Sequence, residues 1–190
     1  MTSSAAKITK LPTGIPGLDL ITEGGLPRVR TTLVTGTAGS AKTVFAVQFI
    51  AEGVKNGENG VFVTFEESPK DIRLNMQGLD WDISTWEAQG KWAFVDASPQ
   101  TEESVVAGAY DLGALMARIE NAVTKVKATR VSLDSLGAIF TQFAEPAIVR
   151  RELLRIATAQ AARCDLGDDG GAQRGVRRDQ PLWRGGIRRR

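Results

Sequence analysis

The chain of 190 residues contains no histidine and a single cysteine, Cys164. Without histidine it cannot build a Ser-His-Asp triad, a papain-type Cys-His pair or an HExxH zinc site. One cysteine excludes an internal disulfide and a CxxC metal site, which favours a reducing compartment. No apolar run approaches the roughly 18 residues of a membrane span, and Met1–Lys10 has no apolar signal-peptide core. These absences predict a cytoplasmic protein without a membrane segment.

The net charge of +2 is small but unevenly distributed along the chain. Apolar residues make up 42% and charged residues 24%, which is typical of a globular protein. Residues 164–190, in contrast, hold seven arginines, four aspartates and six glycines and show no apolar periodicity. This composition is typical of a disordered basic tail. We expect three parts: an N-terminal segment 1–12, a folded domain 13–157 and a tail 158–190.

Within the expected domain, strand-like runs alternate with helix-like segments. This order is typical of βαβ units, in which parallel strands are joined by right-handed crossovers. The predicted strands are Thr31–Thr35, Val61–Phe65, Trp92–Val95 and Arg130–Leu133. The predicted helices cover Thr43–Val54, Pro69 to about Gln77 after a Ser68 cap, a segment capped by Asp111, and Ala147–Ala157. The sequence therefore predicts an α/β fold with a mostly parallel sheet flanked by helices.

Apolar and aromatic side chains in the middle of the chain are expected to build the core rather than a site. In the helix after Asp111, six apolar residues recur at helical spacing along one face: Leu112, Leu115, Met116, Ile119, Val123 and Val126. A group of aromatic residues could stack on nucleic-acid bases, but packing against the sheet is the favoured interpretation. This group comprises Trp81, Trp86, Trp92 and Phe94.

A glycine-rich loop between the first predicted strand and the following helix carries the strongest chemical signal. It reads Gly36-Thr37-Ala38-Gly39-Ser40-Ala41-Lys42-Thr43, close to the phosphate-binding pattern GxxxxGK[ST]. Backbone N–H groups of such a loop surround phosphate oxygens at the positive end of a helix. Lys42 would reach the β- and γ-phosphates, and the Thr43 hydroxyl would ligate Mg²⁺. Ala41 replaces the second glycine, which is tolerable if its φ is negative.

Acidic residues follow two of the predicted strands, at the edge of the sheet where such folds bind ligands. Asp134 ends the strand that begins at Arg130 and is expected to hold Mg²⁺, through water, opposite Thr43. Glu66 and Glu67 follow Val61–Phe65. One of them would orient and deprotonate the water that attacks the γ-phosphate, with Glu66 preferred and Glu67 as alternative or support. Both acids could instead simply favour the N-terminus of the next helix.

Several blocks of residues 13–157 resemble the N-terminal ATPase domain of the KaiC circadian clock family, a RecA-like branch of P-loop ATPases. These blocks are TGIPGLD at 13–19, GTAGSAKT at 36–43, VFVTFEESP at 61–69, YDLGALMARIENA at 110–122, RVSLDSLGAIF at 130–140 and VRRELLRIA at 149–157. The resemblance implies an ATPase that binds ATP through Gly39–Val44 and Mg²⁺ through Thr43, with Glu66 as proton acceptor and Asp134 as Walker-B acid.

The family resemblance also implies assembly and partners. Family members form hexamers with nucleotide between subunits, and clock partner proteins are expected. Their serine/threonine autokinase activity belongs to a second domain that residues 13–157 do not resemble, so kinase activity is not expected here.

The tail is interpreted as another reading frame of the same gene. The family continues with a glycine turn and a buried strand, which 158–190 do not contain. A reading frame shifted by one base joins the last two bases of each codon to the first base of the next codon. From Gln160 onward, the genetic code then permits the sequence KRLGVTSVMTAERSEEYGAISRYGVEEFV. This reading contains an apolar strand followed by an acidic segment. We therefore predict a frameshift between about Ala157 and Gln160, which leaves the domain incomplete at its C-terminus.

Two other functions stay open. RecA-like domains also bind nucleic acid, but no basic loop interleaved with aromatic residues occurs before residue 164. The chain could also be a non-catalytic fragment that binds partner proteins. Of the ATPase and nucleic-acid-binding functions, nucleic-acid binding is the less favoured.

Overall fold

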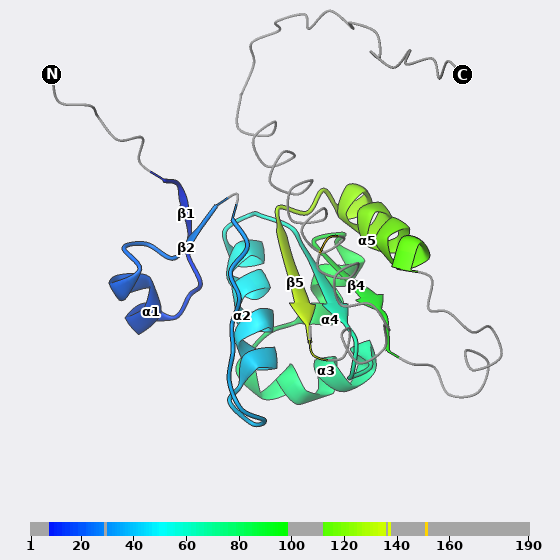
Figure 1. Ribbon diagram of the computed structural model, residues 1–190, viewed down its shortest axis with the longest axis horizontal. Helices are drawn as coiled ribbons and strands as arrows, with labels where there is room; N and C mark the ends of the chain where they lie inside the picture. Colours follow the sequence, from blue (N-terminus) through cyan, green and yellow to red (C-terminus); the bar gives the residue numbers. More distant parts are fainter. Residues whose placement is uncertain (1–7, 29, 99–111, 136, 138–150, 152–190) are drawn as a thin grey trace, which may run out of the picture.

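The computed structural model describes residues 8–28, 30–98, 112–135, 137 and 151. At its centre lies a parallel sheet with helices on both faces (Figure 1). The strand order is β4-β3-β5, and both neighbouring pairs are parallel, as predicted. The strands are β3 (Gly60–Thr64), β4 (Trp92–Asp96) and β5 (Arg130–Asp134).

In the described part of the chain, one face of the sheet is covered by three helices and the other by a single long helix. The three are α2 (Lys42–Lys55), α3 (Pro69–Met76) and α4 (Ile83–Ala88), with a 3-10 turn η1 (Gln77–Leu79) after α3. Ser68 caps α3 as predicted, because its hydroxyl oxygen accepts a hydrogen bond from the Asp71 N–H. Within these helices, no stretch is both long enough and apolar enough to cross a membrane, and the same holds for α1 and α5 among the described helices.

The opposite face is covered by α5 (Leu112–Val126). Five of the six predicted apolar positions are buried against β3 and β4: Leu115, Met116, Ile119, Val123 and Val126. The side chain of Leu112 and the predicted cap Asp111 lie outside the described residues. So do the helix predicted from Ala147 to Ala157, apart from Arg151, and the tail 158–190.

The aromatic residues pack in the core, as expected. Trp92 on β4 is 1% exposed and stacks on Phe62 at a ring-centre distance of 6.3 Å. Trp86 stacks on the same indole at 6.1 Å. Trp81 and Phe94 belong to the same cluster beneath α3 and α4. These rings therefore hold the helical layer on the sheet, and base stacking is not their role in this fold.

The N-terminal part forms a small unit that the sequence did not predict. Strands β1 (Lys10–Leu11) and β2 (Leu26–Pro27) pair antiparallel, and α1 (Pro16–Ile21) lies between them in the chain. Asp19 stabilises the turn before α1. Its carboxylate accepts hydrogen bonds from the N–H groups of Thr13 and Gly14 and from the Thr13 hydroxyl. Burial alone would raise the pKa of Asp19, but these hydrogen bonds outweigh it and lower that pKa.

Residues Thr31–Thr35 do not form the predicted strand. They are irregular and exposed, with Leu33 at 66% and Val34 at 40% exposure. Among the described residues no strand pairs with this segment, and an isolated strand leaves its backbone N–H and C=O groups without a ladder. Within the described part of the chain, β5 pairs with β3 only, and no strand pairs with its second edge.

Arg130 joins the N-terminal unit, α2 and the sheet. Its side chain is 1% exposed and pairs with Glu58, while Nη1 donates to the carbonyl oxygens of Pro12 at 2.7 Å and Phe49 at 2.8 Å. A Cβ at Gly53 would lie 2.5 Å from the Arg130 Cδ, so only glycine lets the helix approach this side chain. The buried arginine is therefore the main polar link between these elements.

Arg130→Ala is expected to destabilise the fold by about 3–5 kcal/mol, because it leaves Glu58 and two carbonyl groups without their buried donor. Arg28 is the matched control: it reaches the same Glu58 at 3.6 Å from a more exposed position. Arg28→Ala should cost no more than about 1 kcal/mol. Urea unfolding of both variants measures the difference, and equal losses would contradict the role given to Arg130.

Candidate nucleotide site at the carboxyl edge of the sheet

The packing of α2 on β5 brings the predicted site residues to the same edge of the sheet. The Ser132 hydroxyl donates to the Ala46 carbonyl at 3.1 Å, and Arg130 reaches the Phe49 carbonyl. The helix therefore runs antiparallel to the strand. Thr43 precedes Ala46 by about 4.5 Å of helix, and Asp134 follows Ser132 by about 6.6 Å of strand. The first turn of α2 and the end of β5 consequently lie at the same level.

The predicted phosphate loop curls around its own lysine. Lys42 Nζ donates to the carbonyl oxygens of Gly36 at 3.1 Å and Thr37 at 2.8 Å, and lies 3.5 Å from the Ser40 hydroxyl. A backbone hydrogen bond from the Ser40 N–H to the Thr37 carbonyl closes the turn. Because residues 31–41 are exposed, an anion can reach the loop from solvent.

At the beginning of α2, the backbone N–H groups are available to a ligand, whereas the side chains differ in their surroundings. The helix starts at Lys42, and no side chain caps its first turn. Val44 packs against the core cluster beneath the helix, so its side chain is structural. Thr43 is half-buried at the helix start. The uncapped N–H groups of this turn are the donors that an anionic ligand would meet.

The expectation of a negative φ at Ala41 was wrong. Ala41 has φ 60° and ψ 27°, in the left-handed region, and Gly39 has φ 77°. The loop must reverse its direction immediately before α2, and this reversal requires positive φ angles at both positions. A residue with a Cβ pays about 1–2 kcal/mol for this conformation, whereas glycine does not.

Ala41→Gly should therefore stabilise the chain, by about 0.5–1 kcal/mol after the larger chain entropy of unfolded glycine is counted. That corresponds to a rise in Tm of about 1–4 °C. Ala46→Gly, inside α2, is the control and should lower stability by about 1 kcal/mol. Thermal unfolding followed by circular dichroism compares the two. A fall in Tm for both variants would show that the backbone at position 41 is not strained.

The two glutamates after β3 point to different neighbours. Glu66 Oε1 accepts a hydrogen bond from the Ser135 hydroxyl at 2.6 Å, which ties it to the end of β5. Glu67 Oε2 accepts from the Asn75 amide at 3.0 Å, on α3. The Phe65 N–H donates to the Asp134 carbonyl and aligns the ends of the two strands. The structure therefore brings Glu66 close to the Asp134–Ser135 corner and turns Glu67 towards α3.

Ser135 was missed by the sequence reading. A serine directly after a strand is an ordinary turn residue, and no sequence pattern pairs it with a glutamate 69 positions away. Only the parallel register of β3 and β5, which pairs Thr64 with Asp134, brings the residues after the two strands together.

The residues at this edge fit a magnesium ion that is held jointly with a nucleotide. Thr43 and Asp134 offer a hydroxyl and a carboxylate, both oxygen ligands of the kind that Mg²⁺ prefers. Across the described ranges, no group of three acidic, cysteine or histidine side chains could enclose a metal alone. Mg²⁺ bound through one carboxylate, water and phosphate oxygens needs no such group.

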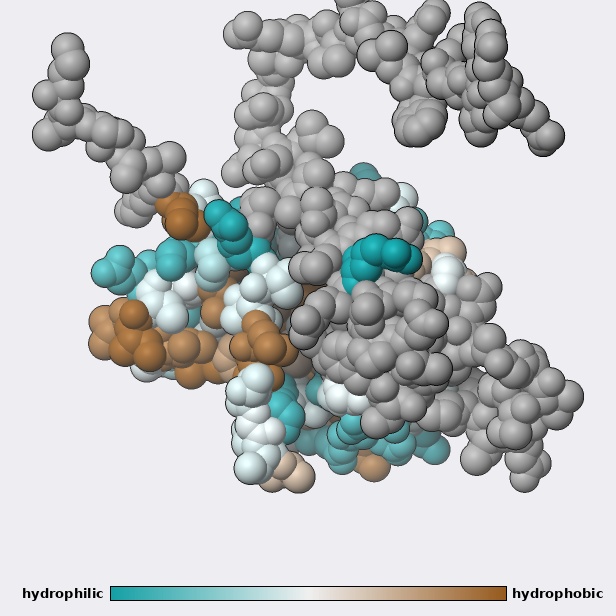
Figure 2. Space-filling view, viewed as in Figure 1, coloured by the Kyte–Doolittle hydropathy of each residue, from teal (hydrophilic) through white to brown (hydrophobic). Residues whose placement is uncertain are grey.

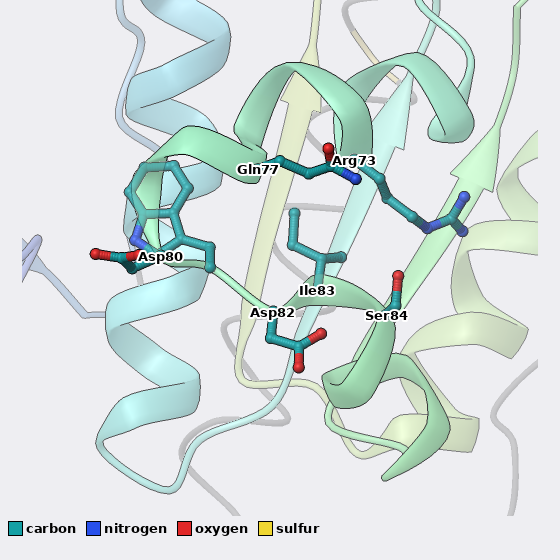
Figure 3. Close-up of a pocket in the computed structure, with 7 residues that line it drawn as sticks. Arg73, Gln77, Asp80, Asp82, Ile83 and Ser84 are labelled. Carbon is teal, nitrogen blue, oxygen red and sulfur yellow. The ribbon is translucent and has the colours of Figure 1, made fainter.

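A separate hollow of about 430 Å³ lies between α3 and α4 and includes none of the predicted site residues (Figure 3). Its cation, Arg73, is held by Glu87 through two hydrogen bonds of 2.6 and 2.8 Å. Asp80 and Asp82 lie along the same hollow. An engaged arginine and two carboxylates do not favour a phosphate ligand, so this hollow is not the nucleotide site.

Comparison with known proteins agrees with this geometry. Residues 11–163 match the family model described as "ATPase: KaiC". The circadian clock protein KaiC3 of Synechocystis sp. is 63% identical over 153 residues, covering 80% of this chain and 30% of that protein. The circadian clock oscillator protein KaiC of Thermostichus vulcanus is 50% identical over 155 residues, covering 81% of this chain and 30% of that protein. The chain thus spans about a third of the length of these relatives. It belongs to the KaiC ATPase family.

Proposed function

We propose that this chain binds ATP with Mg²⁺ at the carboxyl edge of its sheet and that the site is built for ATP hydrolysis. The observation that carries the proposal is the convergence of Lys42, Thr43, Asp134 and Glu66 on this edge. The loop Gly36–Thr43 would place its N–H groups around the phosphates. Lys42 would exchange its bonds with the loop carbonyl groups for bonds with the β- and γ-phosphates.

In the hydrolytic step, Glu66 would orient a water molecule and accept its proton as the water attacks the γ-phosphate. The hydrogen bond from Ser135 holds one carboxylate oxygen and leaves the second for the water. Bound Mg²⁺, held by Thr43 and Asp134, would neutralise charge on the phosphates. Glu67 is occupied by Asn75 and would support the turn rather than the reaction.

Glu66→Gln should lower the rate of phosphate release by about 10²–10³-fold while leaving ATP affinity nearly unchanged, because glutamine can hold the water but cannot take its proton. Glu67→Gln is the matched control and should change the rate by less than about threefold, on the order of half a kcal/mol. Single-turnover assays with protein in excess over labelled ATP measure both. Equal losses in the two variants would remove Glu66 from this role.

We base a proposal for the wider role of the chain on its family. The relatives are named as circadian clock proteins, and we propose a clock-type ATPase that works with clock partner proteins. Its family resemblance implies a homo-oligomer with nucleotide between subunits, and we expect the present chain, with its altered tail, to assemble only in part. A nucleic-acid-binding module is the alternative, and salt-dependent binding of single-stranded DNA by a version ending at Ala157 would favour it. A partner-binding fragment without catalysis would bind ATP or partners with no turnover.

We further propose that the folded domain is residues 13–157 and that 158–190 is read out of frame. Two observations support a departure from the family in this region: the family match stops at residue 163, shortly after the predicted junction, and the genetic code permits an apolar strand from Gln160 in the other frame. The nucleotide sequence across codons 155–165, read from independent isolates, tests it. An uninterrupted gene with the present frame in every isolate would contradict the frameshift.

A further inference from the structure

We propose that Asn56–Gly57 is a spontaneous modification site, at which the asparagine converts to isoaspartate and aspartate through a cyclic imide. The sequence contains two Asn-Gly pairs, Asn56–Gly57 and Asn59–Gly60, separated by a single residue. Asparagine is a thermolabile residue, and a glycine after it leaves the asparagine side chain open to attack because glycine has no Cβ. The two pairs share this chemistry but differ in their surroundings. The proposal does not depend on nucleotide binding.

The reaction involves only the two residues and water. The backbone nitrogen of Gly57 gives up its proton to solvent base and attacks the side-chain Cγ of Asn56. A new C–N bond closes the imide ring, the Cγ–Nδ2 bond breaks, and the side-chain nitrogen takes a proton from water and leaves as ammonia. Water then opens the ring at either carbonyl carbon. One opening gives aspartate, and the other gives isoaspartate, in which the main chain runs through the former side chain and is longer by one carbon atom.

Asn56 and Gly57 lie at the exposed C-terminal end of α2. Figure 2 shows hydrophilic surface near this end of the helix, in contrast to the brown apolar surface over α1. The Gly57 N–H donates to the Val54 carbonyl at 3.1 Å, and Asn56 Nδ2 donates to Glu52 Oε1 at 2.9 Å. Helix ends open at a low cost in free energy, and opening frees both the attacking nitrogen and the amide that it attacks. No atom lies within 4 Å of the place of a Cβ on Gly57, so the imide ring has room.

Asn59–Gly60 has the same chemistry but is held at the start of the central strand. Asn59 Nδ2 donates to the Val126 carbonyl at 2.7 Å, and the Gly60 N–H donates to the Lys91 carbonyl at 3.0 Å. Gly60 is the buried first residue of β3, where a Cβ would collide with the side chain of Ile50. Freeing both groups requires the centre of the sheet to open, which costs far more free energy than fraying of a helix end. The fold therefore protects this second pair.

Conversion at Asn56 would act on the segment that carries Glu58. This glutamate binds the buried Arg130, which joins the N-terminal unit to α2. Isoaspartate lengthens the main chain shortly before Glu58 and so displaces a carboxylate that the arginine holds in place. The new carboxylate also replaces the amide that donates to Glu52, and two negative charges then meet at the negative end of the helix. We expect the converted chain to be less stable and its N-terminal unit to be loosened.

The test follows the intact chain, without nucleotide, during incubation at mildly alkaline pH and at a temperature below its melting transition. Mass spectrometry of the peptide that contains both asparagines locates each conversion, and an isoaspartyl methyltransferase with a labelled methyl donor counts the isoaspartate. Asn56 should convert at least about tenfold faster than Asn59, because a helix end opens far more often than the centre of a sheet. In concentrated urea the two rates should agree within about twofold, since only the fold protects Asn59.

The consequence is measured on the converted chain. Its Tm should fall by about 3–6 °C, and amide hydrogen exchange in β1 and β2 should accelerate. Asn56→Gln keeps an amide at this position but cyclises far more slowly, so it should show neither change after the same incubation. Asn56→Asp adds the charge without lengthening the main chain, and it should lower Tm by less than isoaspartate does.

Three results would overturn the proposal. The first is conversion of Asn59 in the folded chain at the rate of Asn56. The second is an absence of conversion at Asn56 while a synthetic peptide of residues 52–60 converts under the same conditions. The third is a converted chain whose Tm and amide exchange equal those of the incubated Asn56→Gln variant.

Discussion

Replacing Lys42 with alanine should reduce ATP affinity by at least about 10²-fold, because two charge-assisted hydrogen bonds to phosphate, each worth about 1.5–3 kcal/mol, are lost. The side chain is positioned for this exchange: its ammonium group already lies among the carbonyl oxygens of Gly36 and Thr37, inside the turn that would receive the phosphates. Its side chain bonds only to loop residues and is not part of the hydrophobic core, so the fold itself should survive the change.

Lys55→Ala provides the control, since Lys55 is an exposed lysine in the last turn of the same helix, far from the loop. It should leave ATP affinity within about twofold, as expected for surface charges more than a Debye length away. Isothermal titration with ATP and excess MgCl₂ compares the three proteins. If Lys42→Ala retains the affinity of the unmodified chain, the loop is not the phosphate site.

Restoring the other frame after Ala157 should raise the stability of the domain by about 5 kcal/mol. A strand of five or six residues that buries three aliphatic side chains contributes about 1.5–3 kcal/mol for each. The restored strand would also pair the edge of β5 and cover Leu33 and Val34, which are now exposed. Since the free energy of unfolding of a domain is about 5–15 kcal/mol, the present chain should be only marginally stable.

This difference is large enough to measure in simple experiments. The restored chain should melt about 10–20 °C higher than the present one. It should also elute as an oligomer, while the present chain should not assemble fully. Thermal unfolding and size-exclusion chromatography of both proteins provide the readouts. Equal melting temperatures and equal elution would mean that residues 158–190 already complete the domain.

The elements with strong local patterns were predictable from the sequence. The apolar periodicity after Asp111 identified α5, and the β-branched and aromatic runs identified β3, β4 and β5 to within one residue at each end. The sequence also identified Lys42, Asp134 and Glu66 as site candidates, because Lys42 belongs to the phosphate-loop pattern and the two acids follow predicted strands. The structure brings these residues to one edge of the sheet through the packing of α2 on β5.

The features that the sequence did not predict depend on contacts between distant residues. Thr31–Thr35 has a strand composition, but a strand forms only if a neighbour pairs with it. The left-handed φ of Ala41 follows from the path of the loop into α2, which residue type alone does not specify. The hydrogen bond from Ser135 to Glu66 depends on the register of β3 and β5. Asp19 organises its turn through Thr13, six residues earlier.

The most direct test of the proposed site is a map of amide chemical-shift changes when ATP and Mg²⁺ are added to the isotope-labelled chain. The largest changes should fall on Gly36–Thr43, with smaller ones on Glu66 and on Asp134–Ser135, because these segments meet at the carboxyl edge of the sheet. The residues that line the hollow between α3 and α4 and the paired strands β1 and β2 should show no change. Changes centred on Arg73–Ser84, with the loop Gly36–Thr43 unaffected, would contradict the account.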